Sequence, residues 1–141
     1  MELKDLCKSV LVVDDDESTR DLLQLLFKNE GYRVLLAESP EQAEELLFNE
    51  SKAIDLAFID VNYGAKSQQT GFDLAKKIKS QSPHLNFFIM SMDNTQENRL
   101  KSQSLGAIDF VEKNYDLLLD SFKRFQRTSF LKKLQGRHVL H

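Results

Sequence analysis

The amino-acid sequence predicts an α/β protein built on a five-stranded parallel sheet, and three observations lead to this class. The apolar residues gather in five short runs that are rich in β-branched or aromatic side chains, as in buried strands. Segments with apolar residues at three- and four-residue spacing, which is typical of helices, follow these runs. Strand and helix therefore alternate strictly along the chain, the order found in proteins with a parallel sheet.

The expected elements carry start and stop signals. Strands are expected at residues 10–13, 32–37, 56–59, 85–90 and 108–111. Helices are expected at residues 17–30, 40–49, 71–80 and 95–105, and a long fifth helix is expected to begin with Asp116 as its N-cap. Ser39 is placed to cap the second helix, with Gln42 completing a capping box. Gly31 and Gly106 follow the first and fourth helices, where a left-handed residue commonly ends a helix.

Length and composition narrow the class further. A chain of 141 residues is long enough to form one domain with a real hydrophobic core. Its 19 basic and 22 acidic residues give a net charge of −3, which argues against a general nucleic-acid binder. Cys7 is the one cysteine, so no internal disulfide can form, and no apolar stretch is long enough to span a membrane. The N-terminus has no secretory apolar segment, so we expect a cytoplasmic protein.

Three consecutive aspartates, Asp14 to Asp16, come directly after the first expected strand. Two carboxylates roughly 5 Å apart at an effective dielectric near ~20 repel each other by about 3 kcal/mol. Repulsion of this size predicts that a cation lies beside them. The third aspartate, Asp16, is expected to begin the first helix.

Polar side chains also end the other strands: Asp60 ends the third, Ser91 follows the fourth and Lys113 follows the fifth. The carboxyl ends of parallel strands meet at one edge of a sheet, so these side chains are expected to share a pocket with Asp14 and Asp15. Each alone is more often a cap, a turn former or a solvated charge. Together they suit Mg²⁺, which prefers oxygen ligands, and phosphoryl transfer to a carboxylate.

These residues, in this order and spacing, resemble the receiver domain of two-component response regulators, including the single-domain chemotaxis type. The resemblance covers roughly residues 8–130. It implies a doubly wound sheet of five parallel strands in the flavodoxin-like order 2-1-3-4-5, with a (βα)5 chain order. The expected domain division is a receiver domain at residues 1–133 and a basic C-terminal tail at residues 134–141.

The resemblance also implies a role for each polar residue. Asp60 is expected to be the phosphoacceptor, and Mg²⁺ is expected to bind Asp14, Asp15, Asp60 and the main-chain carbonyl of Asn62. The remaining roles are the switch hydroxyl (Ser91), the phosphate-binding lysine (Lys113), the aromatic switch (Phe110) and the side chains that tune hydrolysis of the acyl phosphate (Asn62, Met92 and Asp93).

The implied partners are proteins. A sensor histidine kinase or a phosphotransfer protein would supply the phosphoryl group. A downstream protein would bind the surface formed by the fourth helix, the fifth strand and the fifth helix. From the residues left after the receiver we expect no effector domain, and we expect no turnover of an external substrate. The stretch from residue 121 is basic and has no acidic residue, which fits a solvated helix face with a frayed tail, or else a docking or nucleic-acid contact. Its six charges over 21 residues are too few to favour nucleic acid, and no membrane partner is expected.

The sequence departs from the family pattern at three places. The loop at residues 62–70 is about three residues longer than usual and has neither Met-Pro nor Asp-Gly. Asn114 follows the lysine where the family has a cis proline, and we expect a trans bond because a non-proline cis bond costs about 3 kcal/mol. Met92 is a bulky residue directly after the switch hydroxyl.

Two other functions fit parts of the pattern. A pseudo-receiver would keep the fold as a binding module without being phosphorylated, in keeping with Met92 and the altered loop. A haloacid-dehalogenase-type phosphatase would use the D-x-D-x-[S/T] pattern, with Asp14 as nucleophile and Asp16 as acid/base.

Overall fold

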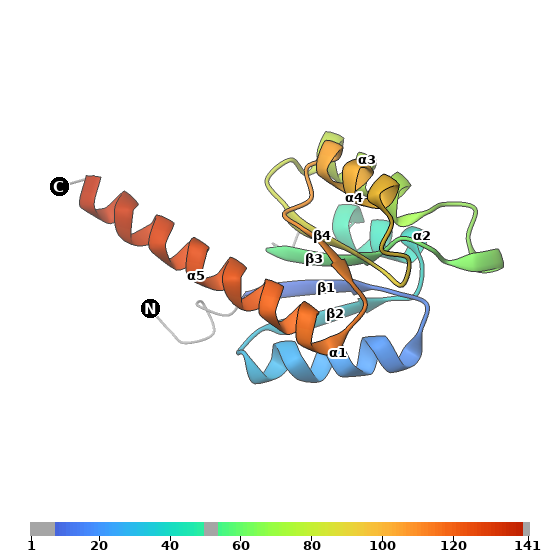
Figure 1. Cartoon of the computed structure of the whole chain (residues 1–141), viewed down its shortest axis with the longest axis horizontal. Coiled ribbons are helices and arrows are strands. Elements are labelled where there is room, and N and C mark those ends of the chain that lie inside the picture. Colours follow the sequence, from blue (N-terminus) through green and yellow to red (C-terminus); the bar gives the residue numbers. More distant parts are fainter. Residues whose placement is uncertain (1–7, 50–53, 140–141) are drawn as a thin grey trace.

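The computed structural model describes residues 8–49 and 54–139 and contains one sheet of five parallel strands (Figure 1). The strands are β1 (Ser9–Val13), β2 (Arg33–Ala37), β3 (Leu56–Asp60), β4 (Asn86–Ser91) and β5 (Phe110–Glu112). Their order across the sheet is β2-β1-β3-β4-β5, so the predicted fold class and strand order are confirmed. Cys7 and the last two residues of the predicted tail lie outside the described residues.

Helices cover both faces of the sheet. They are α1 (Glu17–Asn29), α2 (Pro40–Glu44), α3 (Gly71–Gln81), α4 (Gln96–Ser104) and α5 (Tyr115–Val139). A π-helical turn, η2 (Glu45–Asn49), continues α2, and a 3₁₀ turn, η3 (Gly64–Lys66), lies in the loop after β3. In Figure 1, α1 and α5 lie on one face of the sheet, and α2, α3 and α4 lie on the other. No helix among the described residues is both long and apolar enough to cross a membrane.

Aromatic side chains form much of the core beneath α1 and α5. Phe58 of β3 and Phe88 of β4 stack with ring centroids 4.5 Å apart. Phe27 of α1 and Phe122 of α5 meet edge to face at 4.8 Å, and both are buried. Such pairs add roughly 1 kcal/mol each beyond the area that they bury. This packing fixes the sheet as a rigid platform, and the polar residues stand at its carboxyl edge.

The opposite face of the sheet packs against α3 through Leu74, Ala75 and Ile78, which are fully buried. The capping box of Thr70 and Asp73 sets the start of this helix, because each side chain accepts the other residue's backbone N–H. Ser39 caps α2 as predicted. The Gln42 side chain, however, accepts the N–H of Glu38 instead of completing a box with Ser39.

Two predicted boundaries are wrong by two residues, and the other ends differ from the prediction by at most one residue when η2 is counted with α2. The fifth strand begins at Phe110, two residues later than predicted, because Ile108 still lies in the turn after α4 and donates its N–H to the Phe87 carbonyl. Asn114, and not Asp116, caps α5. Its side-chain oxygen accepts the N–H groups of Asp116 and Leu117 at 2.9 and 3.2 Å, so Asp116 lies in the first turn instead.

Candidate functional site

The β1–α1 loop places the first two aspartates in different surroundings from the third. Asp14 is completely buried, with its Oδ1 accepting the N–H of Asp16 at 2.9 Å, and Asp15 is partly buried. Asp16 is exposed and caps α1, accepting hydrogen bonds from the hydroxyls of Ser18 and Thr19. The prediction that Asp16 begins the first helix is confirmed, and its carboxylate is engaged away from Asp14, against the acid/base role of the phosphatase alternative.

Asp60 stands at the end of β3, beside the two buried aspartates. One carboxylate oxygen from each of Asp14, Asp15 and Asp60 lies within 4.8 Å of the others. Asp60 is buried, and its Oδ1 accepts the N–H of Val61 at 3.0 Å. The sheet therefore brings together, from β1 and β3, the three carboxylates that the sequence places in one cluster.

Lys113 provides the positive charge of this cluster from the end of β5. Its Nζ lies 2.7 Å from Oδ2 of Asp14 and 3.7 Å from Oδ2 of Asp60. The approach to Asp14 lacks hydrogen-bond geometry, so the contact is an ion pair and this oxygen accepts no hydrogen bond from a described residue. The side chain of Lys113 is only 10% exposed, so water screens the pair little.

Burial and like charge shift the proton affinities of these groups. Burial raises the pKa of Asp60 to about 7, with a further rise from the charge of Asp14 that Lys113 only partly opposes. Burial also raises the pKa of Asp14, against the contact with Lys113. Burial alone would lower the pKa of Lys113, but the contact with Asp14 and the charge of Asp60 outweigh it, and the pKa is raised. One ammonium thus faces three carboxylates and does not neutralise them.

The donor set fits a hard divalent cation. The carboxylate oxygens are hard ligands of the kind that Mg²⁺ prefers, and they converge without a thiol or imidazole among them. The buried Oδ2 of Asp14 contacts the Lys113 ammonium at 2.7 Å but accepts no hydrogen bond from a described residue, so it can still serve as a ligand. A cation at this place would satisfy that oxygen and reduce the repulsion.

The comparison with protein families agrees with this arrangement: the model of the response regulator receiver domain matches residues 10–119. The chain belongs to the response regulator receiver family. Two-component signalling through a receiver domain is therefore its class of function.

Several relatives and solved structures are similar to this receiver. A cyclic di-GMP phosphodiesterase of Thermotoga maritima is 31% identical over 94% of this chain and 37% of its own length. A putative NtrX-like response regulator of Rickettsia bellii is 29% identical over 88% of this chain and 26% of its own. The chain thus spans about a quarter to two fifths of these relatives. A solved structure of the response regulator TrrA from Thermotoga maritima, in complex with Mg²⁺ and BeF, is also similar. It has a TM-score of 0.70 and 28% sequence identity, and the match covers 83% of this chain and 97% of that chain.

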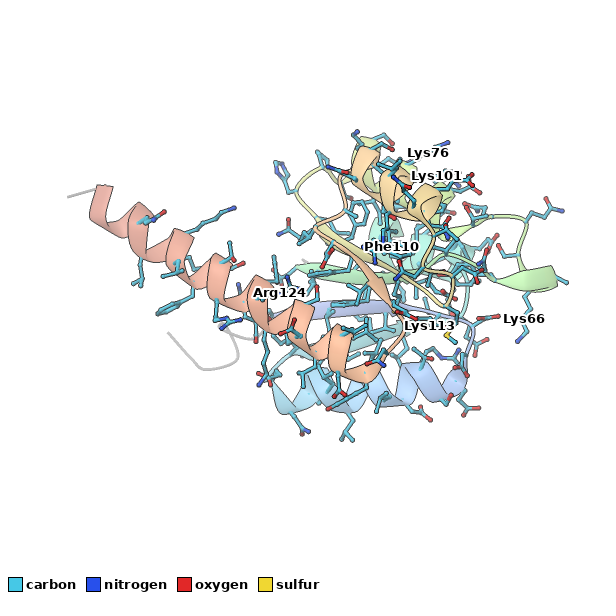
Figure 2. All side chains as sticks on the ribbon, in the orientation of Figure 1. Lys66, Lys76, Lys101, Phe110, Lys113 and Arg124 are labelled. Atoms are coloured by element: carbon cyan, nitrogen blue, oxygen red, sulfur yellow. The ribbon has the colours of Figure 1, made fainter. Side chains whose placement is uncertain are left out.

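The receiver's predicted switch residues lie on β4 and β5, the two strands that follow β3 across the sheet. Ser91 is the last residue of β4 and is completely buried; its Oγ accepts the N–H of Asp93 at 3.0 Å. Its carbonyl accepts the N–H of Lys113 at 2.9 Å, which ties the fourth and fifth strands together at the site. Phe110 is buried, and the Arg99 guanidinium of α4 lies 5.6 Å from its ring centroid. Figure 2 shows Phe110 on the α4 side of the sheet and Lys113 nearer the carboxyl edge.

The residues predicted to tune hydrolysis are all exposed. Asn62 and Asp93 lie in the loops that leave β3 and β4. Met92 is 72% exposed, so its side chain is not packed over the cluster. The bond from Lys113 to Asn114 is trans, as predicted.

Three further residues support the receiver site and were missed by sequence reasoning. The hydroxyl of Tyr63, buried in the loop after β3, donates to the Val13 carbonyl at 2.9 Å. Burial and the nearby carboxylates raise the pKa of Tyr63 well above its usual value, so the phenol keeps the proton that it donates. Arg20 donates to the Asp14 carbonyl at 2.8 Å. A Cβ on Gly71 would lie 2.0 Å from the Asp60 carbonyl oxygen.

Of these three residues, only Gly71 could have been identified from the sequence. It stands where the family's Asp-Gly is expected, although a threonine precedes it here. Tyr63 acts on the main-chain carbonyl that ends β1, and Arg20 acts on the next one, in the β1–α1 loop. No motif or spacing connects a side chain to such a carbonyl.

Proposed function

We propose that this receiver accepts a phosphoryl group on Asp60 from a sensor histidine kinase or a phosphotransfer protein in a Mg²⁺-dependent reaction. The observation that carries the proposal is the position of Asp60: a buried carboxylate at the end of β3, within 4.8 Å of the ligand oxygens of Asp14 and Asp15 and 3.7 Å from the Lys113 ammonium. Receiver domains bind Mg²⁺ in an acidic pocket of this kind. A cytoplasmic location belongs to the same proposal.

We expect the phosphoryl group to be transferred by in-line displacement. A carboxylate oxygen of Asp60 forms a bond to phosphorus while the bond from phosphorus to the donor's imidazole nitrogen breaks. The imidazole keeps the electron pair of that bond and takes up a proton from water. Asp60 then carries an acyl phosphate, whose charge the Lys113 ammonium can pair with.

The bound metal would be held by Asp14, Asp15, Asp60 and the Asn62 carbonyl, and it would screen the charge of the incoming phosphoryl group. Ser91 has a hydroxyl proton to offer, because its oxygen is the acceptor in the contact with the Asp93 N–H. That hydroxyl is our proposed donor to a phosphoryl oxygen. Each polar group at this edge of the sheet thus has a proposed role. The carboxylates would hold the metal, and the Lys113 ammonium and the Ser91 hydroxyl would contact the phosphoryl oxygens.

The signal would leave through the surface of α4, β5 and α5. New charge on Asp60 would pull on the Ser91 hydroxyl and on Lys113, which are joined through the backbone. Phe110 is already buried here, so we expect phosphorylation to shift the population of a conformation that this ring can already adopt. Asn62 and Asp93 remain our candidates for admitting the water that later hydrolyses the acyl phosphate, with Met92 as a weaker shield.

Turnover of an external substrate is not part of the proposal. The relative named cyclic di-GMP phosphodiesterase matches this chain over 37% of its own length, so that name is not transferred to this chain. We also propose that residues 1–133 act as the receiver unit. The helix α5 continues without a break through residue 134, so the boundary with the tail stays a prediction.

Intact mass measurement after incubation with acetyl phosphate tests the proposal. Wild type in Mg²⁺ should gain the mass of one phosphoryl group, and should gain none in EDTA. Asp60→Asn should gain none in either condition, while Asp21→Asn, which changes an exposed carboxylate of α1, should behave as wild type. Mg²⁺ binding without any gain of mass in wild type would favour the pseudo-receiver, and release of phosphate from an unrelated phosphate ester would favour a phosphatase.

A further inference from the structure

The helix α5 continues far beyond the part of the chain that matches the receiver family. The match ends at residue 119, early in α5, and the helix runs on to Val139. Its 25 residues extend about 37 Å at 1.5 Å per residue. In Figure 1 the orange-to-red helix passes along the sheet and then projects beyond it. We call residues 120–136 the α5 extension.

The α5 extension is packed against the sheet only in its first part. Phe122 is completely buried, and Phe125 meets Phe88 of β4 edge to face at 5.8 Å. Further along, Phe130, Leu131 and Leu134 are 61%, 57% and 44% exposed. The spacing of three and four residues places these side chains together on one side of the helix. A projecting helix with an uncovered apolar stripe resembles the helices that bind in a partner's groove.

The charge of the α5 extension is positive and largely uncompensated. Two cations of the extension have acidic neighbours. Lys123 lies 3.9 Å from Glu30, and Arg124 lies 3.4 Å from Asp120. The next three cations are Arg127, Lys132 and Lys133, and none of them forms an ion pair with a residue that the structure describes. Contact with Lys133, together with burial, lowers the pKa of Lys8, so two cations face each other here.

A hollow of about 490 Å³ lies between the α5 extension and the edge of the sheet. The helix contributes Arg124, Thr128 and Lys132 to its wall, β4 contributes Asn86, and the turn before β5 contributes Ile108 and Asp109. Figure 2 shows Arg124 where α5 passes the sheet. Asp109 lies 3.7 Å from Arg124, so an acidic residue already occupies part of this wall. The hollow is on the side of α5 that faces the sheet, which leaves the side with Phe130, Leu131 and Leu134 open to a partner.

We propose that the α5 extension is a docking surface for an acidic amphipathic helix of a partner protein. The partner's apolar residues would cover Phe130, Leu131 and Leu134. Its carboxylates would pair with Arg127, which lies within this stripe, and with Lys133, which flanks it, whereas Lys132 lies on the opposite side of the helix. This surface is separate from the Asp60 site, so the proposal goes beyond phosphorylation and stands or falls independently of it.

Other occupants match the surface less well. A second copy of the α5 extension would bring its own uncompensated cations against these cations, and the heptad positions before Leu131 and Leu134 are Arg124 and Arg127. Nucleic acid would neutralise the charge but leave the apolar stripe exposed to water. An anionic membrane would meet only three apolar side chains of a protein whose net charge is −3. An acidic helix satisfies the apolar stripe and the charge together.

Selection from a displayed library of random helical peptides, with the full chain as bait, tests the chemistry of the partner. We expect enrichment of peptides that combine Asp or Glu with apolar residues at three- and four-residue spacing. The affinity of the most enriched peptide is then measured by fluorescence anisotropy at low and high salt. Binding should weaken as salt rises, since exposed charges are screened.

Variants locate the binding surface. The pair Phe130→Ala and Leu134→Ala, and separately the pair Arg127→Glu and Lys133→Glu, should each weaken peptide binding by about tenfold or more. Matched controls on α1 are Leu25→Ala, which truncates a 60% exposed leucine, and Lys28→Glu; both should bind as wild type. All these side chains are exposed, and equal melting temperatures would show that the fold is kept.

Three results would overturn the proposal. The first is enrichment of peptides without acidic residues. The second is an enriched peptide that binds both pairs of variants as it binds wild type. The third is tighter and variant-sensitive binding to duplex DNA, to phosphatidylglycerol vesicles or to a second copy of the chain, measured by anisotropy, vesicle sedimentation and analytical ultracentrifugation. Phosphorylation of Asp60 is measured separately by mass, so its outcome does not depend on these results.

Discussion

Replacing Asp60 by Asn should stabilise the metal-free protein, and the gain should grow as pH rises. The carboxyl is buried, its pKa is raised to about 7, and its usual value is 3.8. Between these two values the folded state holds a proton that the unfolded state releases. Stability contributed by this group is therefore highest at low pH and is lost as pH rises toward 7.

The size of the effect follows from that shift. Each pH unit of such linkage is worth about 1.4 kcal/mol. The interval from pH 5 to the folded pKa of about 7 is about two pH units. The free energy of unfolding of wild type should therefore fall by about 3 kcal/mol relative to that of Asp60→Asn between pH 5 and pH 8. The asparagine keeps the shape of the side chain but carries no charge against Asp14.

Urea denaturation followed by circular dichroism, in EDTA at pH 5, 6, 7 and 8, measures this difference. Asp21→Asn is the matched control, because it removes an exposed carboxylate of α1 that lies outside the cluster. Adding Mg²⁺ at pH 8 should restore wild type much more than Asp60→Asn. A gap between wild type and Asp60→Asn that stays constant from pH 5 to pH 8 would show that Asp60 carries no proton in this range.

Three further changes test the supports of the site. Lys113→Met should destabilise the metal-free protein by about 3 kcal/mol at pH 8 in urea denaturation, because Asp14 loses its ion pair while fully buried; a change below about 1 kcal/mol would contradict this. Gly71→Ala should lower stability by about 2 kcal/mol or more and slow phosphorylation in the mass assay, since its Cβ would meet the Asp60 carbonyl at 2.0 Å. Met92→Ala should change the half-life of the acyl phosphate by less than about twofold, because the side chain is 72% exposed; a change of about tenfold would show that it shields the site.

The fold could be predicted from the sequence because its signals are local and repeated. Five apolar runs, each followed by a segment with helical spacing, leave few arrangements other than a parallel sheet. Gly31 and Gly106 adopt positive φ angles of 88° and 87°, as their places after helices predict. The errors lie at boundaries. The predicted N-cap of α5 is Asp116, whereas Asn114, two residues earlier, accepts the first N–H groups of the helix.

The carboxylate cluster could also be predicted, because strand ends in a parallel sheet converge at one edge. Asp14, Asp60 and Lys113 come from three strands and lie within ion-pairing distance. What the sequence could not predict is how the loops are held. The hydroxyl of Tyr63 reaches the Val13 carbonyl across 50 residues of chain, and that contact depends on the packing of the whole loop.

The residue that replaces the family's proline gives the site a direct connection to α5. Asn114 follows Lys113, and its side chain caps α5 by accepting the N–H groups of Asp116 and Leu117. Its own N–H donates to the Glu112 carbonyl at 2.7 Å, so the residue is held at both ends. A proline has neither this side-chain acceptor nor this N–H. Lys113 contacts the carboxylates and is the residue directly before this cap. A change of charge at Asp60 that moves Lys113 would therefore also move Asn114 and the first turn of α5.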